Sequence, residues 1–372
     1  LIFVSDVKAV RPHRAMVLLN LGASQFVVLP QFSSGLIYCS FLGGGLRDYA
    51  EDIVVDDSGA VYITGSTQST DFPTSHGTFA TSAANRDVFI AKINPAGDSL
   101  VYAVVIGGNR EDIGSGISVE NGVAYVTGTT NSSDFPFRQG ARTDYDAFVL
   151  ALNQDGTNLN FVSFLGGSGS DYGYDLDVEA GEIYVTGATE SQDFPASGYR
   201  GNGDAFVARL LPDGQIGFTK LLGSSLYDVG FGIAVLEGEA FITGAVNSTE
   251  FPTSFQKVYG DVFVARYNRE GVQIFYSLFG GGSADVANAI VVDAERNSYI
   301  TGRTDSSNIP GMVNIKSGKR DAFAAQLDPR GKLIRGLYLV GSDDDEGSGI
   351  TLYQNNRVFL SGFTQSGDFP VS

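Results

Sequence analysis

The chain has 372 residues, 43% of them hydrophobic, and its 42 acidic residues against 24 basic ones give a formal net charge of −18. A field of this sign repels nucleic acid and anionic membranes, and no apolar run reaches the roughly 18 residues that a membrane-spanning helix needs. The single cysteine, Cys39, excludes an internal disulfide, and we interpret it as a small buried side chain.

The chain opens with an apolar segment, residues 1–23, which carries a few basic residues including Lys8 and Arg14. We treat this segment as an N-terminal extension of unknown role. Two β-rich runs follow, at residues 25–29 and 36–42. Both runs resemble strands of a unit that repeats along the rest of the chain.

That repeat occurs six times, at intervals of 57 to 63 residues. Its copies centre on Ile63-Thr64-Gly65, Val126-Thr127-Gly128, Val185-Thr186-Gly187, Ile242-Thr243-Gly244, Ile300-Thr301-Gly302 and Leu360-Ser361-Gly362. A fixed period of this length is typical of repeat architectures. In the second copy, β-rich runs at residues 87–93, 100–106, 117–119 and 123–127 are separated by Gly- and Pro-containing turns. Each run has the length of a strand, and none shows a helical period.

Several runs are apolar on both faces, as at residues 88–91. Such strands suit sheets that are sandwiched between two neighbours, as in radial blades. We therefore predict an all-β fold: a six-bladed β-propeller over residues 24–372, with four strands per blade. The innermost strands are expected to begin near Ile53, Ile117, Leu176, Ile233, Ile290 and Ile350. The last copy ends before its third and fourth strands, so we expect residues 25–29 and 36–42 to complete it. The sixth blade would then combine two N-terminal and two C-terminal strands.

The repeat resembles the bacterial SBBP-type β-propeller repeat, with a strand order similar to NHL-type propellers. The resemblance rests on Asp321-Ala322-Phe323-Ala324-Ala325, Phe164-Leu165-Gly166-Gly167, Ile53-Val54-Val55-Asp56 and Thr67-Gln68-Ser69-Thr70-Asp71-Phe72-Pro73. It covers residues 25–372. It implies a propeller of a secreted or cell-envelope protein, and it implies no catalytic residue.

One aspartate recurs just before each inner strand, which would place a carboxylate ring at one mouth of the propeller. Its members are Asp48, Asp112, Asp171, Asp228, Asp285 and Asp345. Carboxylates arranged in this way are able to bind Ca²⁺. The alternative is structural, because an aspartate repeated in every blade often accepts backbone hydrogen bonds in a turn. A second set, at the start of the third strands, is interpreted in the same structural way.

The loop that enters the last inner strand is unusual, because it carries four consecutive acids. These are Asp343, Asp344, Asp345 and Glu346. The run occurs once, so the blade does not require it. We interpret it either as a solvated turn or as a cation site, which leaves Ca²⁺ as the one cofactor to consider.

The loops between second and third strands differ freely between copies and should share one face with the aspartate ring. Variable loops on a rigid scaffold often carry binding. The candidate binding residues on these loops are His76, Arg138, Arg142, Tyr199, Arg200, Phe255, Lys257, Tyr259, Lys316, Lys319 and Arg320. For any one loop, the alternative is plain solvation.

Catalysis is not indicated by the sequence. The only histidines, His13 and His76, lie far apart, and no nucleophile–base pattern is legible. We therefore expect a non-catalytic, extracellular or cell-envelope module that binds a protein partner or assembles with itself. The alternative is a polysaccharide-acting hydrolase or lyase on the same face, whose mark would be two close acids with one raised pKa.

Overall fold

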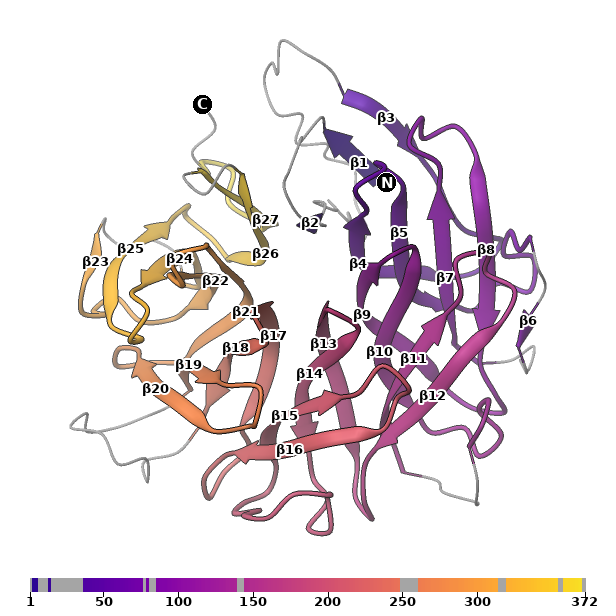
Figure 1. Cartoon of the computed structure of the whole chain (residues 1–372). Helices are drawn as coiled ribbons and strands as arrows, with labels where there is room; N and C mark the ends of the chain where they lie inside the picture. The colour runs from indigo at the N-terminus through magenta and orange to yellow at the C-terminus, as the bar shows by residue number, and fades with distance from the viewer. Residues whose placement is uncertain are drawn as a thin grey trace.

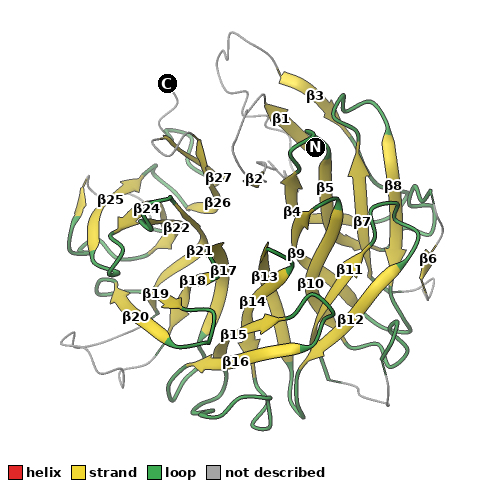
Figure 2. Cartoon of the chain, viewed as in Figure 1, coloured by secondary structure: helices red, strands yellow, loops and turns green. Residues whose placement is uncertain are grey.

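A computed structural model of the chain describes residues 2–5, 13–14, 36–75, 78–79, 85–138, 144–247, 260–313, 319–353 and 357–369. These residues form strands and connecting loops and contain no helix (Figure 2). None of them forms a helix of the length and apolarity needed to span a membrane.

Five blades of four antiparallel strands follow one another along the chain. The first comprises β4 (Asp48–Val55), β5 (Val61–Thr67), β7 (Asp87–Ile93) and β8 (Leu100–Ile106). The second comprises β9 (Asp112–Glu120), β10 (Val123–Thr130), β11 (Asp146–Leu152) and β12 (Leu159–Leu165). The third comprises β13 (Asp171–Glu179), β14 (Glu182–Thr189), β15 (Asp204–Leu210) and β16 (Ile216–Leu222).

The fourth blade comprises β17 (Val229–Leu236), β18 (Glu239–Val246), β19 (Asp261–Tyr267) and β20 (Gln273–Phe279). The fifth comprises β21 (Asp285–Val292), β22 (Ser298–Thr304), β24 (Asp321–Leu327) and β25 (Leu333–Leu339). Short strands β6 (Thr78–Phe79) and β23 (Met312–Val313) pair in parallel with β8 and β25. Next in the chain come β26 (Asp345–Tyr353) and β27 (Arg357–Thr364), which form a two-stranded sheet.

The sheets are arranged radially, with the first strand of each nearest a common axis (Figure 1). These inner strands contact one another in the order β4, β9, β13, β17, β21 and β26. This arrangement confirms a propeller and the choice of innermost strands. These strands begin four or five residues earlier than predicted, so that the recurring aspartate is the first residue of β4, β9, β13, β21 and β26.

The core lies between the blades rather than within any one of them. Between the first two blades, Tyr62 and Ile90 pack with Val126 and Phe148, and all four are fully buried. Each sheet is therefore covered on both faces, which explains why its strands are apolar on both sides.

The Thr-Gly pair at the centre of the repeat allows the second strand to approach the inner strand closely, as the second blade shows. The register of β9 against β10 shifts between Thr127 and Gly128, so β9 bulges there. A Cβ atom on Gly128 would lie 1.9 Å from the carbonyl oxygen of Ile113. Only glycine fits this approach, while the Thr127 hydroxyl donates to the carbonyl oxygen of Phe148 at 2.8 Å.

The sixth blade differs from the prediction. Within the described residues, the sheet of β26 and β27 has two strands, so a four-stranded sixth blade is not confirmed. Residues 36–40 do form a strand, β3 (Leu36–Ser40), but it pairs antiparallel with β1 (Ile2–Ser5). Pairing with β1 satisfies backbone groups that a bare edge strand would expose. Residues 25–29 lie outside the described part of the chain.

The N-terminal extension also supplies β2 (His13–Arg14), which pairs antiparallel with the inner strand β4. The same short strand contacts β26. It therefore lies between the first inner strand and the last one.

Candidate functional site

Alternate residues at the start of several inner strands differ in their surroundings. In β9, Asp112, Gly114 and Gly116 are buried, whereas Ile113 and Ser115 are partly exposed. The same alternation occurs at the start of β13 and β21. The buried positions repeat from blade to blade, but the partly exposed ones change in chemistry.

These changing positions converge on a cavity of about 480 Å³ near the axis. We call this cavity the axial pocket, and it is lined by Glu51, Ile113, Ser115, Thr129, Tyr145, Tyr172, Tyr174, Phe231 and Asn288. Most of these residues lie one or three positions after a recurring aspartate. The axial pocket thus opens at the end of the propeller where the inner strands begin. The signal in the sequence lies in the non-repeating positions of the inner strands, and the predicted binding residues did not include them.

A chain of aromatic rings forms one wall of the axial pocket. The rings of Tyr145 and Tyr172 lie 5.8 Å apart. Tyr172 is stacked with Tyr174 at 6.3 Å and an interplanar angle of 15°. Phe231 continues the chain, with its ring 5.3 Å from Tyr174. Burial and the neighbouring Tyr172 and Glu190 raise the pKa of Tyr174 to about 12, so its hydroxyl stays neutral at physiological pH.

The lining also carries a carboxyl group, that of Glu51 in β4, which is an exposed residue. Desolvation by the surrounding protein raises the pKa of Glu51, and Arg86 opposes this shift only partly. Arg86 is engaged elsewhere, because its Nε and Nη2 atoms donate to Glu111 at 3.2 and 3.1 Å. Glu111 also accepts from the Tyr145 hydroxyl at 2.8 Å.

The recurring aspartates are built into the blades. Asp112, Asp171, Asp228, Asp285 and Asp345 are fully buried. In the second blade, Asp112 accepts from the Gly108 N–H at 2.7 Å and from the Ser132 hydroxyl at 2.8 Å. Asp48 does the same with Gly44 and Ser69, at 2.8 and 3.0 Å. These contacts support the structural interpretation of the set.

The aspartates at the start of the third strands lie beside them. A Cβ atom on Gly280 would approach Asp261 at 2.1 Å and Asp285 at 2.8 Å, so both carboxyl groups converge on this glycine. Burial, together with the neighbouring Asp285, raises the pKa of Asp261 to about 7. No group of three or more potential metal ligands occurs within the described ranges.

The four acids of residues 343–346 have separate surroundings. The Asp343 N–H donates to Ser366 at 2.8 Å, and Asp345 accepts from the same hydroxyl at 3.0 Å. Glu346 pairs with Arg303 at 3.1 Å and accepts from Asn288 at 2.7 Å. The backbone carbonyl of Asp344 accepts from the Gln365 N–H at 2.9 Å.

The loops after the second and fourth strands meet at the aspartate end of the propeller. The Asn109 N–H, for example, donates to Asp134 at 2.7 Å, and the Ser168 N–H donates to Asp193 at the same distance. We call this end the loop face. It holds the axial pocket together with the candidate binding loops.

The candidate residues on the loop face fall into different settings. Arg200 and Lys319 are exposed, and Tyr199 is partly exposed, with its hydroxyl donating to the Glu190 carbonyl at 3.2 Å. The Nε atom of Arg320 lies 3.7 Å from the Oδ1 atom of Asp305, within ion-pair distance. His76, Arg142, Phe255, Lys257, Tyr259 and Lys316 lie outside the described residues.

Arg138 is a correction to the predicted binding face. Its side chain is only 3% exposed and forms an ion pair with Asp146, which is equally buried. It also donates to the Ser132 carbonyl at 2.8 Å and lies over the ring of Phe164. The ion pair with Asp146 neutralises the Arg138 charge inside the second blade. Arg138 therefore stabilises the blade and is not presented to a ligand.

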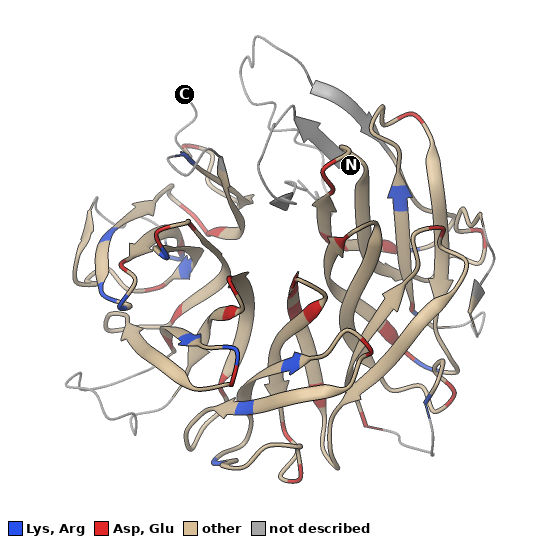
Figure 3. Cartoon of the chain, viewed as in Figure 1, with Lys and Arg blue, Asp and Glu red and all other residues tan. Residues whose placement is uncertain are grey.

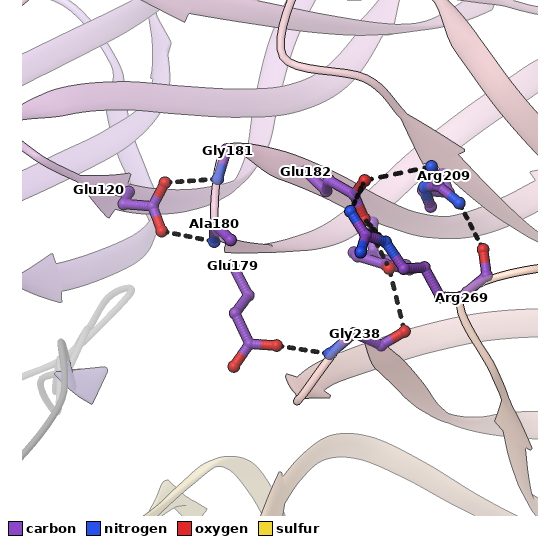
Figure 4. A network of polar contacts seen from close by, with 9 residues as sticks. Glu120, Glu179, Ala180, Gly181, Glu182, Arg209, Gly238 and Arg269 are labelled. Carbon is purple, nitrogen blue, oxygen red and sulfur yellow. Dashed lines mark hydrogen bonds and ion pairs between the residues drawn. The ribbon is translucent and has the colours of Figure 1, made fainter.

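The opposite end of the propeller carries a polar network that joins blades (Figure 4). Glu120 accepts from the N–H groups of Ala180 and Gly181 in the next blade, both at 2.7 Å. Glu179 accepts from Gly238 of the blade after that at 2.6 Å. Acidic residues also lie on the strands around the axis, as Figure 3 shows.

Comparison with known proteins gives low similarity over most of the chain. The gluconolactonase of Xanthomonas campestris is 14% identical, with 82% of this chain and 86% of that chain covered and a TM-score of 0.38. The Pan2 WD40 domain of Neurospora crassa is 10% identical, with 84% and 85% covered and a TM-score of 0.38. A mutant apocarotenoid oxygenase of Synechocystis is 11% identical, with 82% and 61% covered and a TM-score of 0.38.

No curated protein sequence matches the chain. The SBBP family, described as a β-propeller repeat, matches residues 42–73 and 274–310. The first match spans the turn before β4 together with β4 and β5, and the second spans β20 to β22. Both segments include the inner strand and the Thr-Gly centre of a repeat. Two repeats of this β-propeller are therefore similar to the SBBP repeat.

Proposed function

We propose that this protein is a non-catalytic binding and assembly module that engages a protein partner, or a second copy of itself, through the loop face. One observation carries the proposal. The recurring residues have structural roles within the blades, as Asp112 and Gly128 do. The non-recurring residues, in contrast, line the axial pocket. Variation gathered at one end of a rigid ring is the usual arrangement of a grafted binding site.

The lining of the axial pocket supports binding more than hydrolysis. Retaining and inverting glycosidases require a pair of carboxyl groups across the scissile bond. Among the described residues that line the axial pocket, Glu51 is the only carboxylic acid. The hydrolase alternative therefore lacks its second acid at this place, and a reducing-end assay with envelope polysaccharides would detect any turnover.

We place the module outside the cytoplasm, in the cell envelope or the extracellular medium. Support comes from the SBBP-type repeats, which resemble those of secreted and envelope proteins, and from the net charge of −18. A strongly acidic protein stays soluble and favours basic partner surfaces.

The proposal is tested by retention of a partner on the immobilised chain. We expect the wild-type protein to retain one protein stoichiometrically from a surface fraction of its source, or to self-associate in sedimentation analysis. Replacing Tyr199, Arg200 and Lys319 together with serine should abolish retention, because these side chains are presented on the loop face.

The matched control carries three serine replacements at the opposite end of the propeller. Asp155, Glu270 and Lys332 are exposed there, in the turns between third and fourth strands. This variant should bind as the wild type does. Equal retention by both triple variants, or none by the wild type, would contradict the proposal.

A further inference from the structure

We propose that the axial pocket binds an organic cation, an alkylammonium or guanidinium group, between its aromatic wall and the Glu51 carboxylate. The inference rests on the proposed binding function and specifies the chemistry of its site. The cationic group comes either from a free small molecule or from a side chain of the partner protein. Both sources present the same chemistry to the pocket.

The aromatic wall supplies the first part of the argument. Three of its rings, those of Tyr172, Tyr174 and Phe231, come from the inner strands of two neighbouring blades. All three are partly exposed toward the axial pocket although they belong to strands that are otherwise buried. The faces of aromatic rings carry negative potential and attract cations within about 6 Å of the ring centroid.

The charge of the lining supplies the second part. Within the described ranges, no lysine or arginine lines the axial pocket. Two arginines next to lining residues are paired with other carboxylates, since Arg86 pairs with Glu111 at 3.1 Å and Arg303 pairs with Glu346 at 3.1 Å. Among the described residues, no hydrogen bond or ion pair engages the Glu51 carboxylate. Within the described part of the chain, Glu51 is therefore the charged group of the lining that no ion pair engages.

This combination discriminates between ligand classes. An anion would meet the Glu51 carboxylate without a lysine or arginine among the described lining residues to offset the repulsion. A neutral ligand would cover the Glu51 carboxylate, which is exposed in the free protein, and would leave it without a partner, which costs free energy. A cation gains from both the rings and the carboxylate, so it is the class that the lining selects.

The experiment measures binding to the intact chain by isothermal titration calorimetry with three probes. Choline represents the free cation, and the peptide Gly-Gly-Arg-Gly-Gly represents a side chain of a protein. The third probe, 3,3-dimethylbutan-1-ol, has the shape of choline without its charge. We expect choline or the peptide to bind, and whichever binds tighter identifies the source. The neutral alcohol should bind at least about ten-fold more weakly than choline, because it loses the charged interaction.

Variants assign the binding to the axial pocket. Glu51→Gln should weaken cation binding by at least about ten-fold, and Tyr174→Leu by about 2-fold to 30-fold. Tyr174→Phe keeps the ring and should retain binding. Glu270→Gln, in an exposed turn at the opposite end, is the matched control and should leave affinity unchanged.

The inference would be overturned if neither cation binds, if the neutral alcohol binds as well as choline, or if Glu51→Gln binds like the wild type. These outcomes are distinct from failure of the proposed function. Retention of a partner without cation binding would reject only the cation inference. Cation binding without any partner or self-association would reject the assembly function and leave the pocket chemistry standing.

Discussion

At the residue scale, the repeat signature is explained by a few close contacts. The glycine of each Thr-Gly pair allows the second strand to approach the bulged inner strand, and the preceding threonine hydroxyl donates across to the third strand. The phenylalanine before the loop proline packs on the phenylalanine of the third strand, as with Phe135 and Phe148 at 5.0 Å. These residues recur because the blade geometry requires them, so their recurrence carries no information about a ligand.

Gly128→Ala tests the close approach. The added methyl group would lie 1.9 Å from the Ile113 carbonyl oxygen and 2.8 Å from the Phe148 ring, so the strands must separate. We expect the free energy of unfolding in urea to fall by about 1–3 kcal/mol, the usual cost of overpacking. Gly367→Ala is the control, since no atom lies within 4 Å of its added Cβ. Equal stability of the two variants would show that the second strand tolerates a side chain at this position.

At the element scale, neighbouring blades are joined by polar contacts between residues 54 to 87 positions apart in the sequence. Glu182 of the third blade pairs with Arg209 of the same blade at 3.1 Å and with Arg269 of the fourth blade at 2.6 Å. The Tyr184 hydroxyl donates to the Gly238 carbonyl of the fourth blade at 3.0 Å. The contacts to Arg269 and Gly238 fix the angle between two blades in addition to the apolar packing between them.

Glu182→Ala tests this joint. The Glu182 side chain is 8% exposed and that of Arg209 is 16% exposed, so removal of the carboxylate leaves a largely buried guanidinium without its partner. We expect the free energy of unfolding to fall by about 2–3 kcal/mol. Glu270→Ala, in an exposed turn of the fourth blade, should change it by less than about 0.5 kcal/mol. A loss no larger than that of the control would mean that the apolar packing alone holds the two blades.

The blades were predictable from sequence because each is a local unit whose period, turns and apolar runs are readable within about 60 residues. The contacts between blades were not predictable, because residues such as Glu120 and Ala180 are 60 positions apart and belong to different blades. The axial pocket was missed for a related reason. Its lining comes from single positions in several blades, such as Glu51, Tyr174 and Asn288, which share a place in space and no motif. The pairing of β3 with β1 was not predictable from the repeat either, since residues 2–5 do not belong to any copy of the repeat.

At the scale of the whole molecule, the propeller buries many carboxyl groups. Between successive blades, an aspartate at the start of a third strand lies near the aspartate at the start of the next inner strand. Burial raises the pKa of Asp87 to about 8, with Asp112 and Asp134 adding to the shift, and burial likewise raises the pKa of Asp112 to about 6. Burial is also the leading cause for Asp171 and Asp204, each raised to about 6. The folded chain thus keeps protons that the unfolded chain releases near pH 4.

The sign of this linkage determines how stability depends on pH. Between about pH 4 and pH 8 the folded state binds more protons than the unfolded state, so the free energy of unfolding falls as pH rises. We expect the melting temperature, measured by circular dichroism at constant ionic strength, to be higher at pH 5 than at pH 8. Glu111 and Glu182 act in the opposite sense, because their lowered pKa values remove stability only as pH falls below about 4.5.

Asp261→Asn separates the buried aspartates from the general repulsion of a chain with a net charge of −18. An amide at residue 261 does not titrate, so the variant should lose less stability than the wild type between pH 5 and pH 8. Asp155→Asn removes a negative charge from an exposed turn and should keep the wild-type slope. If both variants flatten the profile equally, overall charge governs the pH dependence. A flatter profile for Asp261→Asn alone would assign the pH dependence to the carboxyl pairs between the blades, because burial there raises the pKa of Asp261.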